Sequence, residues 1–259
     1  MLLALVILIC GLTASWLFAS NFLEIMTMDY NAPDLIGTKQ EIRRNFLEQI
    51  STWEIFIDSS MFYLINFIPV LFILPTLGLF AEKRSLYIFG RHRYPSFKKA
   101  VYKDVAQYVF LSVVTVVFSF ITFYSIGGLF VYRSIEDIGG FSAILPENFY
   151  INHPYLFFVF MVCTIYLSLT IVFSLLSCAL VLLTDREYKV ILLILLIYFL
   201  YGKLGVYTES ILFDIFTSFT AFNTNYSTFE TFIPLVILLI ISLILLALGV
   251  KKVTKNIEG

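Results

Sequence analysis

Apolar positions along the chain fall into six long blocks, and the segments between them carry nearly all of the charged residues. The blocks cover residues 2–20, 61–81, 106–132, 155–183, 188–203 and 232–250. A helix needs about 20 apolar residues to cross a hydrocarbon core of about 30 Å, and only structures that satisfy their own backbone hydrogen bonds survive in lipid. The pattern therefore predicts an all-α integral membrane protein with about six transmembrane helices, organised as one domain over residues 1–259.

Two of the connecting segments have helix patterns of their own. Thr38 and Glu41 have the spacing of a capping box, in which each side chain bonds a backbone N–H at the start of a helix. Apolar residues then recur at helical spacing as far as Trp53, and packing on the bundle is a better interpretation of this helix than ligand binding. An apolar stripe over residues 209–222 is expected to lie in the membrane interface or to dip into the outer leaflet. We therefore expect short external helices after the first and the fifth spans.

Composition and charge support a membrane protein and give it an orientation. Hydrophobic residues make up 60% of the chain, charged residues 14%, and the mean hydropathy is +0.92, whereas soluble domains are about 45–50% apolar and about 25% charged. Twelve of the 17 lysine and arginine residues lie between the second and third blocks, between the fourth and fifth, or in the C-terminal tail. The positive-inside rule then places both termini in the cytoplasm. No broadly basic face is left for nucleic acid.

The N-terminal block and the cysteines admit simple interpretations. No lysine or arginine precedes the first block, and no small-x-small cleavage site follows it, so an uncleaved first helix is favoured over a signal peptide. Cys10, Cys163 and Cys178 are scattered at lipid depth, where they suggest neither a disulfide framework nor a zinc site. Within the fourth block, Thr170 and Ser174 stack with Cys178 at four-residue spacing and predict a helix-packing ridge. Most of the 28 Phe and 16 Tyr residues are expected to face lipid or to anchor the interfaces.

A search for reactive groups returns few candidates. The sequence has no glycine-rich phosphate loop followed by Lys and Ser or Thr, and the topology places His92 and His153 on opposite sides of the membrane. The interiors of the blocks lack the ionisable groups that proton- or sodium-driven carriers need, the polar lining of a channel, and the clustered polar groups of a lipid-modifying enzyme. The chain is therefore predicted to have no catalytic, metal-binding or cofactor-binding residues, and any transport would draw its energy from a partner.

The connection over residues 82–103 mixes basic and aromatic side chains. A short helix docked in a partner's groove would use the bases for steering and the aromatic rings for buried contact. A segment lying on anionic lipid headgroups would use the same residues, and composition alone leaves both interpretations open.

The layout resembles a known family. The second block ends in Ile73-Leu-Pro-Thr-Leu-Gly78, and Glu82-Lys-Arg-Ser-Leu-Tyr-Ile-Phe and a basic run follow it. This arrangement resembles the permease subunits of type-two ABC exporters, as do the long fourth block, the short fifth block and the final Lys251-Lys252. One departure is that Met1 begins almost inside the membrane, where the family has a cytoplasmic interfacial helix.

The resemblance implies a function and partners. Two permeases, identical or paralogous, would pair in the bacterial plasma membrane, each on a separate ATPase subunit that binds the ATP, and would export an amphiphilic peptide, drug or lipid-like substrate. The residues expected to couple to the ATPase are Glu82, Arg84, Arg91, Tyr94, Phe97 and Lys98. The alternative is a polytopic membrane protein that transports nothing, such as an immunity or sensor protein.

Overall fold

The computed structural model describes residues 2–30, 32, 35–84, 96–131, 134, 140–221, 227 and 229–258, and these residues form helices and connections without a strand. Among them, five helices are long and apolar enough to cross a membrane. They are α1 (Leu2–Ala19), α8 (Phe97–Gly127), the helix Pro154–Leu183, α12 (Glu187–Thr208) and α14 (Ile233–Glu258). The helix Pro154–Leu183 consists of α10 (Pro154–Met161), a π-helical turn η4 (Val162–Tyr166) and α11 (Leu167–Leu183). The chain is thus an all-α protein with five candidate membrane-spanning helices.

Five of the six predicted spans coincide with these helices, although the helix ends differ from the block ends. Helix α8 begins at Phe97 rather than at residue 106, because residues 98–104, which include three lysines and Asp104, are compatible with a helix that extends beyond its apolar part. Helix α12 likewise continues past Lys203 to Thr208. Hydropathy marks the part of a helix that fits in lipid and does not mark where the helix ends.

The expected continuous helix over residues 61–81 is wrong. The chain instead forms a broken series of helical pieces: α4 (Trp53–Phe62), η1 (Leu64–Asn66), α5 (Ile68–Ile73), η2 (Leu74–Gly78) and α6 (Leu79–Arg84), where η1 and η2 are 3₁₀-helical. Pro69 and Pro75 lie at the starts of α5 and η2. Proline lacks a backbone N–H and its ring clashes with the preceding turn, so it starts a helical piece but interrupts a continuous one.

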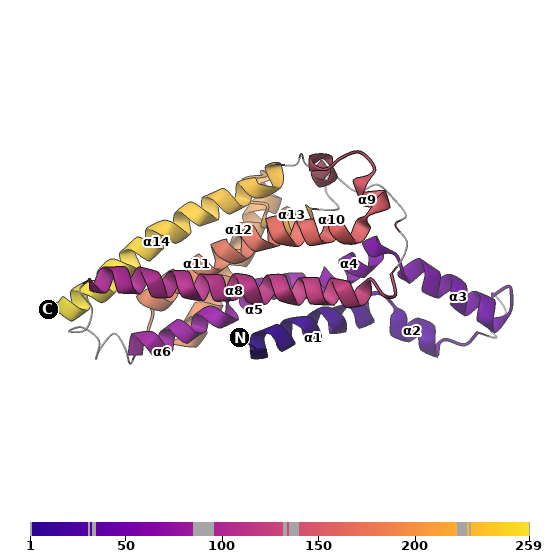
Figure 1. Cartoon of the computed structure of the whole chain (residues 1–259), viewed down its shortest axis with the longest axis horizontal. Coiled ribbons are helices and arrows are strands. Elements are labelled where there is room, and N and C mark those ends of the chain that lie inside the picture. The colour runs from indigo at the N-terminus through magenta and orange to yellow at the C-terminus, as the bar shows by residue number, and fades with distance from the viewer. Residues whose placement is uncertain are drawn as a thin grey trace.

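The long elements alternate in direction along the molecule (Figure 1). The end of α6, the start of α8 and the C-terminal end of α14 all lie at one end of the molecule. At the opposite end, α2 (Phe22–Thr27) and α3 (Lys39–Ile50) project beyond the ends of α1 and α8. We call the first end the basic end, because Lys98, Lys99 and the lysines of the tail belong to it. We call the opposite end the hairpin end, because α2 and α3 pack against each other there.

Helix α11 is the centre of the bundle and packs against α14, α8, α5 and α12. The predicted ridge of Thr170, Ser174 and Cys178 is fully buried, which confirms it as a packing surface. The approach of α14 to α11 is close, since a Cβ atom on Gly249 would lie 2.9 Å from the Cβ atom of Leu182.

The capping box of α3 is confirmed. The backbone N–H of Thr38 donates to Oε2 of Glu41 at 2.9 Å, and the backbone N–H of Glu41 donates to Oγ1 of Thr38 at 3.3 Å. These bonds to the carboxylate hold the pKa of Glu41 below its ordinary value. Helix α3 therefore begins where the sequence predicts.

A short helix follows the fifth span, as expected. It is α13 (Ile215–Phe219), and its Ile215, Ser218 and Phe219 side chains are fully buried. Of the two predicted arrangements, this burial fits a segment that turns back into the protein between α12 and α14 better than one that lies on the surface.

The remaining short elements among the described residues are η3 (Gly140–Ile144), α9 (Phe149–Asn152) and η6 (Glu230–Phe232).

Candidate functional site

A buried tyrosine of α12 supplies a hydrogen bond to the backbone at η1, the first break in the series of helical pieces α4–α6. The hydroxyl of Tyr198 donates to the carbonyl oxygen of Ile65 at 2.7 Å, and the Tyr198 side chain has no exposed surface. Ile65 lies in η1, where the chain changes from one helical piece to the next and backbone carbonyls lose their intrahelical partners. A buried carbonyl without a partner costs about 1–3 kcal/mol. The tyrosine therefore stabilises the break.

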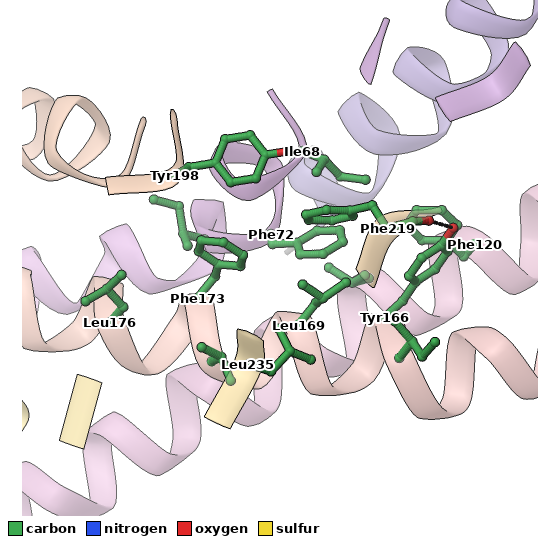
Figure 2. Close-up of a cluster of buried hydrophobic side chains, with 14 of the residues drawn as sticks. Ile68, Phe72, Phe120, Tyr166, Leu169, Phe173, Leu176, Tyr198, Phe219 and Leu235 are labelled. Carbon is green, nitrogen blue, oxygen red and sulfur yellow. Dashed lines mark hydrogen bonds between the residues drawn. The ribbon is translucent and has the colours of Figure 1, made fainter. Parts of the chain in front are cut away.

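Helix α13 lies beside this break. The ring centroid of Phe219 is 6.2 Å from that of Phe72 in α5 and 5.9 Å from that of Tyr198. Tyr166, from the π-helical turn η4, donates its hydroxyl to the carbonyl oxygen of Phe219 at 3.2 Å (Figure 2). Two interrupted segments, α4–α6 and α13, thus meet each other and the π-helical turn in the interior of the bundle. We call this junction the break cluster and define it by Ile65, Phe72, Tyr166, Tyr198 and Phe219.

Further hydrogen bonds fix the chain on both sides of α13. The hydroxyl of Tyr201 donates to the carbonyl oxygen of Leu212 at 2.6 Å and lies 3.1 Å from that of Pro234. The hydroxyl of Ser218 donates to the carbonyl oxygen of Thr231 at 2.7 Å. These bonds hold the residues before and after α13, so α13 is anchored by polar contacts as well as by packing. We call residues 209–221, which carry α13 back into the bundle, the re-entrant segment.

Two glycines of α12 allow α13 to approach. A Cβ atom on Gly202 would lie 2.1 Å from the ring of Phe216, and one on Gly205 would lie 2.8 Å from the Cα atom of Asp214. Any side chain at either position would collide with the re-entrant segment. The two glycines, one turn apart, form a flat face on which α13 and its preceding turn lie.

A hydroxyl pair joins the second break to α11. Oγ1 of Thr76, in η2, lies 2.6 Å from Oγ of Ser177, and Thr76 also donates to the carbonyl oxygen of Ile73. Both side chains are fully buried. Helix α11 is therefore bonded to the interrupted segment near its second break.

The break cluster consists of apolar and hydroxyl-bearing side chains around irregular backbone turns. Its members are aromatic and aliphatic side chains with hydroxyl and carbonyl groups, without a carboxylate or a histidine. Within the described part of the chain, no group of three or more His, Cys, Asp or Glu side chains could hold a metal ion. What distinguishes the cluster is its backbone: 3₁₀ and π-helical turns inside long helices mark hinges and functional sites.

The predicted coupling residues at the basic end are only partly brought together. Arg91 and Tyr94 lie outside the described residues. Glu82 accepts a hydrogen bond from the hydroxyl of Tyr108 at 3.4 Å. Arg84 donates to the carbonyl oxygen of Asp185 at 3.3 Å and forms an ion pair with Glu187 at 3.4 Å.

Phe97 and Lys98, the other two predicted coupling residues, lie at the start of α8. Phe97 is half-buried and packs against the core, whereas Lys98 is exposed. Four of the six predicted residues are therefore placed. Arg84 binds the α11–α12 connection and Glu82 binds α8. Phe97 packs inward, and Lys98 remains available at the surface.

Two lysines that are not among the predicted coupling residues bind the C-terminal end of α11. Lys83 donates to the carbonyl oxygens of Val181 at 3.1 Å and Thr184 at 2.5 Å, and Lys252 donates to that of Leu183 at 2.8 Å. Cations at a helix C-terminus bond its free carbonyls and stabilise its negative dipole end. Burial lowers the pKa of Lys83, and the carboxylate of Asp185 opposes that shift.

The chain stands apart in comparisons with known proteins. No family model matches it, and neither a curated protein nor a solved structure matches it.

Sequence reasoning missed the tyrosines of the break cluster, for which one signal was present. Tyr166 lies in the middle of the fourth apolar block, and a tyrosine at such a depth needs a hydrogen-bond partner for its hydroxyl. The partner itself could not be read from the sequence, because Phe219 lies 53 residues further along the chain.

Proposed function

We propose that the chain is the membrane permease subunit of an ATP-driven exporter, and that a separate subunit binds and hydrolyses the ATP. Its substrate class is an amphiphilic peptide, drug or lipid-like molecule. Residues 61–81 form the sixth, interrupted span, and both termini lie in the cytoplasm of a bacterial cell. A second permease copy or a paralogue and two ATPase subunits complete the complex.

The observation that carries this proposal is the meeting of two interrupted segments in the break cluster. Broken backbone within the membrane is tolerated where it is buried in protein, and secondary transporters build their substrate sites near the bilayer midplane from discontinuous helices. The pieces α4, α5 and α6 can change their mutual angles at η1 and η2 without breaking a long helix. A rigid structural or purely anchoring protein has no need of such joints.

The contacts of the basic end supply a route from a partner to these joints. Helix α6 ends at Arg84 and α8 begins at Phe97, so both flank the predicted docking segment. Through Lys83 and Arg84, α6 is bonded to the end of α11 and to the α11–α12 connection. A displacement of the docking segment by a partner would therefore move α6 and α8 together, and α6 would turn against α5 at η2. Such rigid-body alternation through an interface is a common form of coupling.

The proposed energy source rests on the sequence and on the side chains of the break cluster. None of the five residues that define the cluster is a carboxylate, a histidine or a lysine that could carry a coupling proton or hold a sodium ion. The carboxylate that acts electrostatically on Tyr166 is that of Asp58, in α4. The sequence also has no phosphate-binding loop, and we therefore assign ATP hydrolysis to a partner.

The experiment is affinity purification of the tagged chain from its native membranes. We expect an ATPase subunit to co-purify, and the complex to hydrolyse ATP while the isolated chain does not. Charge reversal at the exposed residues of α8, Lys98→Glu with Lys99→Glu, should weaken association about tenfold, since a few interface residues dominate a contact. The matched control reverses two exposed charges at the hairpin end, Lys39→Glu with Arg44→Glu, and should leave association unchanged.

Two results would contradict the proposal. Robust ATP turnover by the isolated chain would place hydrolysis in this subunit. A chain that retains no ATPase, in membranes from which other ATPase complexes are recovered intact, would favour the immunity or sensor alternative.

A further inference from the structure

Two hollows adjoin at the hairpin end of the molecule. The larger, of about 710 Å³, lies between α1, α2, α3 and α8, and its lining is almost entirely apolar, with Trp16, Met26, Phe56, Phe123 and Phe130 among its residues. The smaller, of about 370 Å³, is lined on α3 by Gln40, Arg43, Arg44 and Glu48. Leu47 and Ser51 belong to both hollows. The pair thus has an apolar chamber of a size typical of ligand sites, joined to a polar one.

Arg43 stands where the two hollows meet. Its guanidinium donates to Sδ of Met26 at 2.9 Å, and Met26 lines the apolar hollow. A thioether is a weak acceptor, and in the described part of the chain Arg43 has no carboxylate partner. Arg44 differs, because it pairs with Glu48 one turn along α3 at 3.6 Å. Arg43 therefore keeps most of its hydrogen-bonding capacity for another acceptor.

The surroundings of the apolar hollow suit entry from a lipid bilayer. Ile126, in the last turn of α8, and Leu129 and Phe130, just after α8, line it and are 51%, 79% and 67% exposed. Exposed apolar surface of this kind suits contact with acyl chains. Trp16, on the α1 wall, is of the residue type that gathers at the membrane–water interface. With α1 and α8 spanning the bilayer, the apolar hollow would lie at the edge of the hydrocarbon region and the polar hollow beyond it.

We propose that the two hollows bind one anionic phospholipid, with an acyl chain in the apolar hollow and the phosphate on Arg43. Charge and shape both favour this occupant. The guanidinium of Arg43 can pair with phosphate oxygens in a bidentate manner, whereas Glu48, the carboxylate in the polar hollow, pairs with Arg44. Only an amphiphile fills an apolar and a polar hollow together. The site depends on neither the ATPase partner nor the export of any substrate, so it can exist whether or not the proposed function is correct.

The test uses the full chain with the substitution Trp53→Phe, which leaves Trp16 as the one remaining tryptophan of two. Phosphatidylglycerol with brominated acyl chains is titrated into the detergent-solubilised protein, and quenching of Trp16 fluorescence is compared with that by brominated phosphatidylcholine. We expect half-maximal quenching by phosphatidylglycerol at about one tenth of the phosphatidylcholine fraction, the preference expected of one charge-assisted contact. Lipid retention by the chain with both tryptophans, measured by native mass spectrometry, gives the same comparison without the Trp53 substitution.

Variants separate this site from general attraction to a charged micelle. Arg43→Gln should remove the preference for phosphatidylglycerol, and Leu47→Phe, which narrows the junction of the hollows, should weaken quenching by both lipids. Lys39→Gln removes one charge from the same helix outside both hollows and should retain the preference. Equal quenching by the two lipids in the unmodified site, or an unchanged preference in Arg43→Gln, would overturn the proposal. Displacement of the lipid by inorganic phosphate would also overturn it, because the site would then be one for the free anion.

Discussion

The position of α13 against α12 can be tested by filling the space above two glycines. Gly205→Ala would place a Cβ atom 2.8 Å from the Cα atom and 2.9 Å from the backbone nitrogen of Asp214. Backbone atoms cannot turn aside as a side chain does, so the re-entrant segment would have to shift. At Gly202→Ala the nearest atoms would be those of the Phe216 ring, at 2.1 Å, and a side-chain ring can rotate away. The two substitutions are chemically identical and differ in what they meet.

The expected magnitudes follow from two opposing contributions. Alanine favours a helix over glycine by about 1 kcal/mol, whereas overpacking costs about 1–3 kcal/mol. With backbone atoms in the way, Gly205→Ala should reach the upper part of that range and lower the free energy of unfolding by about 2 kcal/mol. Gly202→Ala should lower it by about 1 kcal/mol or less. Gly11→Ala is the control, because its Cβ atom would make only an ordinary contact with Leu64 at 3.4 Å, and it should be neutral or stabilising.

The assay is unfolding of the purified protein in mixed micelles by titration with sodium dodecyl sulfate, followed by tryptophan fluorescence. The cost of Gly202→Ala should disappear in a Phe216→Leu background, whereas the cost of Gly205→Ala should persist there, since coupling is expected only between groups in contact. If Gly205→Ala were as harmless as Gly11→Ala, α13 would not lie on α12. If Phe216→Leu relieved both substitutions equally, the distinction between side chain and backbone would be wrong.

Two further predictions concern the break cluster and the orientation. Tyr198→Phe should lower the free energy of unfolding by about 0.5–2 kcal/mol, because it leaves the buried carbonyl of Ile65 without its donor. The same change at the exposed Tyr207 should have no measurable effect. Equal effects at both positions would count against the role of the hydroxyl. In a chain with Cys10, Cys163 and Cys178 replaced, a membrane-impermeant maleimide added to intact cells should label Ala143→Cys and not Ser96→Cys, and the reverse pattern would invert the proposed topology.

The sequence predicts well those features that depend on neighbouring residues. The five candidate spanning helices coincide with apolar blocks because the length of an apolar run is a local property. The capping box is equally local: Thr38 and Glu41 are three residues apart, and both of its bonds are present. The burial of the ridge that ends at Cys178 follows from the four-residue spacing of small side chains on one helix face.

The interrupted second segment shows where averaging over a block fails. Residues 61–81 are as apolar as a continuous span, and hydropathy over about twenty residues does not register Pro69 and Pro75. The prolines were visible in the sequence, but proline also occurs in membrane helices whose neighbours satisfy the freed carbonyls. Whether a proline kinks or interrupts a helix depends on those neighbours, and here one of them is Tyr198, 133 residues beyond Ile65.

In the segment after the second block, residue type was informative and the contact was not. Its basic residues were expected to dock on another protein or to lie on anionic headgroups, and that expectation stays a prediction. Arg84 binds Asp185 and Glu187, and the neighbouring Lys83 binds the end of α11 about a hundred residues away. A lysine that reaches for a helix C-terminus and one that reaches for a partner look alike in a sequence, because both are cations at the end of an apolar block.

The aromatic content has a structural cause that composition conceals. The many tyrosines suggest lipid-facing bulk and interfacial anchors, yet Tyr166 and Tyr198 are buried and donate their hydroxyls to the carbonyl oxygens of Phe219 and Ile65. An interior that holds a broken helix and a re-entrant one contains carbonyls that no helix satisfies, and side chains can supply the donors. Tyrosine meets this need better than serine, because its ring fills the core while its hydroxyl reaches a carbonyl on another element. If the breaks are the joints of a moving permease, these hydroxyls determine how firmly each joint is held, and their removal should change motion more than fold.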